Sequence, residues 1–219
     1  MIELVIFDCD GVLIDSEGLS AEVLLSELAA LGLALDMDYF CAHFMGRSFP
    51  TVAEDIRDRF DLVLPETFEA SYRARLLRAF EARLQPTNGV VEVIEALAVP
   101  ACVATSSSPK RASNSLRIAR LTEYFPGVVF TASEVARGKP APDLFLHTAA
   151  RMGVRPEACL VIEDSLPGIA AGVAAGMRVL RYTGGSHLAG RMLKHGADVE
   201  VFDKWSDFFE IFPELKRDM

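Results

Sequence analysis

Two aspartates, Asp8 and Asp10, are separated by one residue and followed by Gly11. Glycine lets the backbone turn at this point, so the two carboxylates can converge. Like charges this close need a cation between them, and Mg²⁺ prefers oxygen ligands of this kind. The pair therefore indicates a magnesium site, although Asp and Gly are also ordinary turn residues.

Two later segments carry groups that suit the binding of phosphate. Ser106 follows an apolar run and comes shortly before Pro109, a residue that fits the first position of a helix. A hydroxyl beside the free amides of a helix N-terminus favours an anion. Lys139 precedes a proline, which disfavours helix at the lysine and holds it in an extended loop. Ser106 and Lys139 are therefore candidates for binding phosphoryl oxygens.

A second acidic pair, Glu163 and Asp164, ends another apolar run. Two acids at the end of a buried strand are costly unless a metal ion or hydrogen-bond donors compensate them. Taken alone, the pair also fits a turn in which Ser165 caps the following helix. Beside the first acidic pair, it is a further candidate for metal binding.

The elements that must position these groups are short and almost continuously apolar. Such runs are typical of strands buried on both faces of a parallel sheet. Segments with helical periodicity separate them, which predicts an α/β fold with a doubly wound parallel sheet. In such a sheet, ligands bind beyond the carboxyl ends of the strands, where the polar groups described above lie. The predicted strands are residues 4–7, 102–105, 128–131, 159–162, 179–182 and 199–202.

One region interrupts this alternation. Residues 17–84 contain amphipathic helical segments and no convincing strand. We interpret them as an all-helical cap domain inserted into a core domain of residues 1–16 and 85–219. The two crossing points, near Ser16 and near Gln85, would then serve as hinges.

The composition narrows the class of function. The 219 residues include 22 basic and 31 acidic side chains, with a formal net charge of −9. Sequence-independent binding of nucleic acid needs clustered Lys and Arg, so no nucleic-acid partner is expected. No apolar stretch is long enough to span a bilayer, and the four scattered cysteines suit a reducing compartment. We expect a cytoplasmic monomer without a membrane partner.

In combination these motifs resemble the haloacid dehalogenase-like hydrolases, especially the branch that holds β-phosphoglucomutase and many small-molecule phosphatases. The resemblance covers the whole core in the right order, and the helical insert matches the cap position of that branch. One such motif is weak evidence, whereas four in order are strong. The matching segments are Asp8-x-Asp10-Gly-Val-Leu-x-Asp15-Ser16, Thr105-Ser106, Lys139-Pro140-x-Pro142-Asp143, and Glu163-Asp164-Ser165 with Gly168.

The resemblance implies a Rossmann-like core and a phosphatase acting on a small phosphorylated metabolite, such as a sugar or sugar-acid phosphate. Asp8 would attack phosphorus and form an aspartyl-phosphate. Asp10 would protonate the leaving oxygen and then deprotonate the water that hydrolyses the intermediate. Ser106 and Lys139 would bind the transferred phosphoryl group.

The resemblance also implies Mg²⁺ as cofactor. The Asp8 carboxylate, the Asp10 backbone carbonyl and Asp164 would hold the ion. Glu163 would either bind the ion directly or contact the residues that bind it. Because Asp10 needs a proton to act as an acid, we expect neighbouring carboxylates and cap closure to raise its pKa.

Two other activities occur on the same core. The dehalogenases of this family lack the acid two residues after the nucleophile, so Asp10 argues against cleavage of a 2-haloacid. A sugar phosphomutase of the β-phosphoglucomutase type carries His, Lys and Arg in its cap, where this chain has Ser20, Met45 and Phe49. A binding module without turnover is a third reading. Since every expected catalytic residue is present, simple hydrolysis is the favoured reading.

Substrate selection in this family is attributed to the cap, which closes over the site. Arg47, in the segment Gly46-Arg47-Ser48, is our candidate for contacting a carboxylate or a second anionic group of the substrate. The alternative is that Arg47 is only a surface charge.

Overall fold

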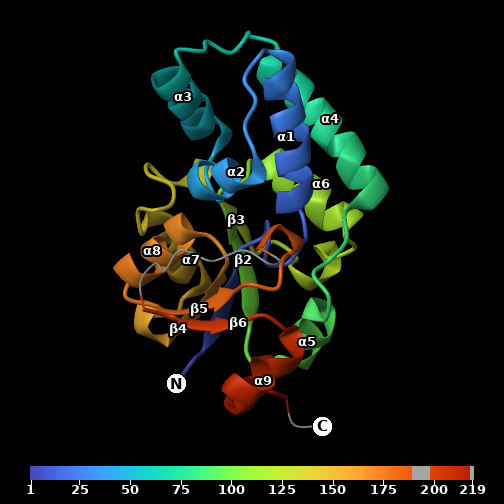
Figure 1. Ribbon diagram of the computed structural model, residues 1–219. Helices are drawn as coiled ribbons and strands as arrows, with labels where there is room; N and C mark the ends of the chain where they lie inside the picture. Colours follow the sequence, from blue (N-terminus) through green and yellow to red (C-terminus); the bar gives the residue numbers. More distant parts are fainter. Residues whose placement is uncertain (189–197, 218–219) are drawn as a thin grey trace.

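The computed structural model describes residues 1–188 and 198–217. Six parallel strands form one sheet in the order β3-β2-β1-β4-β5-β6 (Figure 1). This confirms the predicted α/β fold. The strand order changes direction between β1 and β4, and ligands bind at this point in such sheets. The strands are β1 (Leu4–Phe7), β2 (Ala101–Thr105), β3 (Val129–Thr131), β4 (Cys159–Glu163), β5 (Arg178–Tyr182) and β6 (Glu200–Phe202).

Strand β1 lies in the centre of the sheet and is buried along its whole length. Successive side chains of a strand point to opposite faces. Val5 and Phe7 accordingly belong to one apolar cluster, and Leu4 and Ile6 belong to another. Because both faces are covered, the strand sequence is continuously apolar, as predicted.

Two groups of helices cover these faces. The face of Leu4 and Ile6 packs against α7 (Asp143–Met152) and α8 (Leu166–Ala174). The opposite face packs against α5 (Val90–Ala96), α6 (Pro109–Ile118) and α9 (Phe208–Ile211).

Four further helices lie together beyond the carboxyl ends of the strands, at the top of Figure 1. Helices α1 and α4 pack against each other, and ion pairs from Glu27 to Arg75 and from Glu22 to Arg83 connect them. As predicted, the described chain has no strand between α1 and α4. The helices are α1 (Glu17–Ala30), α2 (Met37–His43), α3 (Phe49–Phe60) and α4 (Phe68–Arg83).

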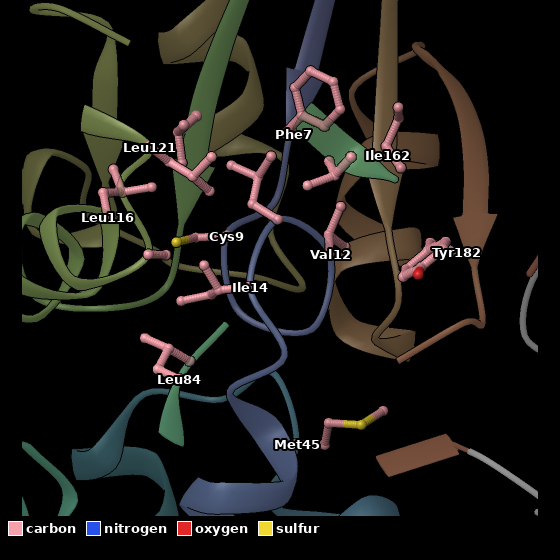
Figure 2. Close-up of a cluster of buried hydrophobic side chains, with 14 of the residues drawn as sticks. Phe7, Cys9, Val12, Ile14, Met45, Leu84, Leu116, Leu121, Ile162 and Tyr182 are labelled. Carbon is pink, nitrogen blue, oxygen red and sulfur yellow. The ribbon is translucent and has the colours of Figure 1, made fainter. Parts of the chain in front are cut away.

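The chain enters and leaves this helical region through two adjacent segments. The amide of Asp15 donates to the carbonyl of Gln85 at 3.0 Å, and Ile14 forms a bridge with Pro86. Figure 2 shows the apolar side chains around this junction, with Ile14 between Cys9 and Leu84. The two predicted crossing points therefore lie side by side.

The prediction placed several strand ends one residue away from their observed positions. Strand β3 begins at Val129 and β6 begins at Glu200, each one residue later than predicted. Hydrophobicity marks which residues are buried, whereas the strand ends depend on hydrogen bonds to the neighbouring strand. Across the described residues, no helix combines the length and the apolar character needed to cross a membrane.

Candidate active site

Lys139 connects three strand ends. Its Nζ atom lies 2.5 Å from Asp8 Oδ1, 2.7 Å from Glu163 Oε1 and 3.0 Å from the carbonyl oxygen of Ala104. Asp8 follows β1, whereas Ala104 and Glu163 belong to β2 and β4. The Lys139 side chain is only 1% exposed. The three predicted residues Asp8, Lys139 and Glu163 therefore meet in one buried cluster.

The cluster carries more negative than positive charge. Burial raises the pKa of Asp8 well above its ordinary value; Lys139 opposes this effect, while Glu163 and Asp164 reinforce it. For Lys139, burial alone would lower the pKa, but Asp8 and Glu163 raise it above the usual value. The Lys139 ammonium and the Arg181 guanidinium, which interacts electrostatically with Asp164 and Glu163, face three carboxylates, so the cluster keeps a net negative charge that a bound cation would balance.

Glu163 is occupied by donors of the protein. Its Oε1 accepts from Lys139, and its Oε2 accepts from the amide and hydroxyl of Ser165 at 2.8 and 2.9 Å. Gly168 allows this arrangement, because a Cβ atom there would lie 1.7 Å from Glu163 Oε1. Glu163 therefore suits a role in orienting Lys139 better than direct coordination of a metal.

The surroundings of Asp164 fit a magnesium ion. Its Oδ2 is buried and accepts no hydrogen bond, and its pKa is raised well above the ordinary value by burial and by Glu163. Gly11 lies against this oxygen, where a Cβ atom would approach to 2.1 Å. The described part of the chain holds no ready-made group of three acidic, His or Cys side chains around a metal position. The predicted magnesium ligands do not need three such side chains, because Asp10 would contribute its backbone carbonyl instead of its carboxylate.

The carboxylate of Asp10 points to other partners. Its Oδ1 accepts from Ser16 Oγ at 2.6 Å and from Arg111 Nη2 at 2.9 Å, and its Oδ2 accepts from Ser107 Oγ at 2.6 Å. Burial raises the pKa of Asp10, but Arg111 and the two serines outweigh burial and lower it below the ordinary value. The expectation of a raised pKa was therefore wrong for this conformation, because a guanidinium, rather than further carboxylates, lies against Asp10.

A cavity of about 560 Å³ lies between these groups and the helices α1 to α4. Asp8, Asp10 and Lys139 border it from the sheet, and Ser106 does so with its hydroxyl bound to no described residue. Arg47, between α2 and α3, borders it from the opposite side and is exposed. This volume suits a small metabolite. The structure thus brings the predicted phosphate-binding and specificity residues to one cavity.

Comparison with known proteins decides the family. The family model of the haloacid dehalogenase-like hydrolases matches residues 2–176. The chain belongs to this family. The predicted family and the prediction of a hydrolase are confirmed.

Individual relatives agree with this assignment. A 6-phosphogluconate phosphatase from Escherichia coli K12 is 30% identical over 187 residues, 85% of each chain. A phosphorylated carbohydrates phosphatase from Thermotoga maritima is 32% identical over 183 residues, 80% of this chain and 82% of the relative. The solved structure of a haloacid dehalogenase-like protein of unknown function from Agrobacterium tumefaciens has a TM-score of 0.82 at 31% identity, covering 98% of this chain and 99% of the other.

The three positions where sugar phosphomutases of this family carry basic residues hold no cation here. Ser20 is 2% exposed and donates to the carbonyl of Ser16 at 2.9 Å. Met45 is buried, and Phe49 stacks on Tyr72 with ring centroids 5.6 Å apart. These three residues are therefore not basic themselves, although Arg111 donates to Ser20 Oγ and Arg73 lies 5.9 Å from the ring centroid of Phe49.

Arg111 is a functional candidate that the sequence reasoning missed. It forms an ion pair with Asp10, donates to Ser20 Oγ at 3.1 Å and lies 5.5 Å from the ring centroid of Phe80. A signal was available, because Arg111 lies in the first turn of α6. Cations are unfavourable at a helix N-terminus, so a basic residue there suggests an anionic partner.

His187 was also missed. It is 3% exposed, and its Nε2 lies 2.9 Å from Asp164 Oδ2, without the alignment of a hydrogen bond. Asp15 anchors the same loop, because its Oδ1 accepts from the amide and hydroxyl of Ser186 at 3.0 and 2.8 Å. Burial lowers the pKa of His187. A lone histidine 23 positions after Asp164 offered no sequence signal for this contact.

Proposed function

We propose that the protein is a magnesium-dependent phosphatase that hydrolyses a small phosphorylated sugar or sugar acid through an aspartyl-phosphate on Asp8. The observation that carries this proposal is the buried contact between Lys139 and Asp8 at the floor of the cavity, with Asp10 nearby. A carboxylate nucleophile divides the hydrolysis into two easier steps.

In the first step, a carboxylate oxygen of Asp8 forms a bond to phosphorus while the bond from phosphorus to the substrate oxygen breaks. Phosphoryl transfer depends mainly on positioning and on neutralising the charge of the phosphoryl oxygens. Lys139 holds Asp8 through Oδ1 and carries positive charge beside the phosphoryl group. Ser106 supplies a hydroxyl that is not bound to another described residue.

Asp10 serves both steps. It gives a proton to the departing alcohol oxygen and later takes one from the water that attacks the aspartyl-phosphate. The observed hydrogen bonds from Ser16, Ser107 and Arg111 favour the carboxylate form, which is the form the second step requires. For the first step, Asp10 must gain a proton, so we expect substrate binding to weaken its contact with Arg111.

Magnesium, when bound, would neutralise negative charge on the phosphoryl oxygens and on the nucleophile. The residues that would hold it are the Asp8 carboxylate, the Asp10 backbone carbonyl and the Asp164 carboxylate. Glu163 would not bind the ion itself; it would hold Lys139 in place, with its other carboxylate oxygen bound to Ser165.

The cavity and the relatives support this choice of substrate class. The cavity has room for a small metabolite, and both Arg47 and Arg73 border it from the cap region. The two curated relatives are named for 6-phosphogluconate and for phosphorylated carbohydrates. An arginine on the cap side would bind the carboxylate of a sugar acid, and we retain residues 17–84 as the cap that selects the substrate.

A sugar phosphomutase remains the second candidate, because one observation favours it. Arg111 places a guanidinium beside Ser20, the position where the mutases of this family carry a basic residue. A mutase would interconvert two sugar phosphates and would need a bisphosphate activator, whereas a phosphatase releases phosphate.

Dehalogenation is disfavoured by Asp10, and chloride release from a 2-haloacid without Mg²⁺ would contradict that exclusion.

The decisive experiment compares the wild type with Asp8→Asn and with Asp58→Asn, the same chemical change at an exposed position. Phosphate release from an aryl phosphate is measured with Mg²⁺ and with EDTA. We expect release only with Mg²⁺, a loss of at least about 10³-fold in Asp8→Asn, and no change in Asp58→Asn. Absence of release from the aryl phosphate and from a panel of sugar phosphates would reject the phosphatase.

A further inference from the structure

Glu17 is a buried acid that the proposed reaction does not use. It is the first residue of α1, where the chain enters the cap helices, and it is 6% exposed. It borders the active-site cavity, and no described residue donates a hydrogen bond to its carboxyl group. Such a group at a cavity wall is available to a ligand.

The other acids of the same helix have partners. Glu22 pairs with Arg83 at 2.9 Å, and Glu27 pairs with Arg75. Both lie on the side of α1 that faces α4, and their partners belong to α4. Glu17 is thus the one acid of α1 that forms no ion pair and accepts no hydrogen bond within the described chain.

The neighbours of Glu17 favour its neutral form. Burial, followed by the charges of Asp10 and Asp164, raises the pKa of Glu17 to about 8, while His187 and Arg111 act in the opposite direction. A neutral carboxylic acid has one O–H donor and a carbonyl acceptor. An alcohol hydroxyl, which also donates and accepts, matches it better than an amine, which would require the ionised acid.

Glu17 also lies on the side of the cavity where the leaving group is expected. Asp10, the residue proposed to protonate the departing oxygen, is the charge that raises its pKa most. Ser20, in the same first turns of α1, borders the cavity and contacts Arg111. The alcohol part of a substrate bound at Asp8 would therefore face Glu17.

We propose that Glu17 binds a hydroxyl group of the alcohol part of the substrate, close to the carbon that carries the phosphate. This inference rests on the proposed phosphatase function, and it narrows the substrate class to phosphorylated polyols with a free hydroxyl near the phosphoester. Since Glu17 is the first residue of the helical cap, the contact links recognition of the substrate to the cap rather than to the sheet.

The test compares two substrates in the Mg²⁺-loaded enzyme. One is an aryl phosphate without a hydroxyl group, and the other is the best substrate among 6-phosphogluconate and a panel of sugar phosphates. In Glu17→Met, which keeps the size of the side chain, we expect kcat/KM for the polyol phosphate to fall about 10- to 100-fold. For the aryl phosphate it should change less than about threefold. Glu17→Gln should retain most activity toward both, because an amide also donates and accepts.

Glu22→Met is the matched control, since Glu22 lies on the same helix and is exposed. It should leave the ratio of the two kcat/KM values unchanged. An equal loss on both substrates, or no loss, in Glu17→Met would overturn the role of Glu17. If Glu17→Met does not fold, Glu17→Asp, which withdraws the carboxyl group by one methylene, must show the same selective loss. Failure of the wild type on every phosphoester would instead reject the proposed function itself.

Discussion

The two sides of the active-site cavity are built differently. On the phosphoryl side, Lys139 donates to three acceptors, and both carboxylate oxygens of Glu163 accept hydrogen bonds. On the leaving-group side, Arg111 Nε is buried without a partner, and Glu17 accepts from no described residue. The phosphoryl group is the same in every phosphorylated substrate, so Lys139 and Glu163 held in place by several hydrogen bonds suit it, whereas groups with unused hydrogen-bonding capacity suit a variable ligand.

Lys139→Met would disrupt the paired side most strongly. Two buried carboxylates would lose their ammonium, so we expect kcat/KM to fall by at least about 10³-fold. The free energy of unfolding should also fall by about 3–5 kcal/mol. Phosphate release and urea unfolding measure the two effects. Lys110→Met, at an exposed position, is the control. Retained activity in Lys139→Met would mean that Lys139 does not bind the phosphoryl group.

Arg111→Met would test the leaving-group side. Arg111 lowers the pKa of Asp10, so its removal should raise that pKa and move the limb of the pH–rate profile that belongs to Asp10 to higher pH. We expect kcat/KM to fall about 10- to 100-fold for a sugar phosphate. Arg117→Met, an exposed change in the same helix, should show neither effect. An unshifted limb would show that Arg111 does not control Asp10.

His187→Ala should have the smallest effect, because His187 would act on the metal only through Asp164. We expect Mg²⁺ affinity to fall about 10-fold or less, since the contact lacks hydrogen-bond alignment. The rise in melting temperature on titration with Mg²⁺ measures this without turnover. His187→Gln, which retains an N–H group, should restore most of the affinity. An unchanged Mg²⁺ affinity in His187→Ala would mean that His187 contributes only to packing.

The grouping of the residues on the phosphoryl side could be predicted because its sequence signals are local, whereas their binding of phosphate stays a prediction. Asp8 directly follows β1, Glu163 is the last residue of β4 and Lys139 lies in the loop after β3, and parallel strands bring such positions to one edge. The Asp10 carbonyl, Ser106 and Asp164 belong to the same class of positions. Their grouping follows from strand order alone, whereas Mg²⁺ coordination stays a prediction.

The leaving-group side could not be predicted in the same way. Arg111 meets Asp10 across 101 positions of sequence, and the contact requires the first turn of α6 to reach over the end of β1. The error about the pKa of Asp10 has the same origin. The charged residues nearest to it in sequence, Asp8 and Asp15, are acidic, but the group that controls its pKa comes from a distant helix.

By itself, the sequence determined the alternation of strands and helices, the helical insertion and the polar residues at the strand ends. Hydrophobic periodicity and turn chemistry are properties of short segments, so they can be read without knowing the contacts. Only the tertiary structure decided that Arg111 pairs with Asp10 and that Glu17 has no hydrogen-bond partner among the described residues. Burial and charge compensation depend on which distant residues meet, and packing alone settles that.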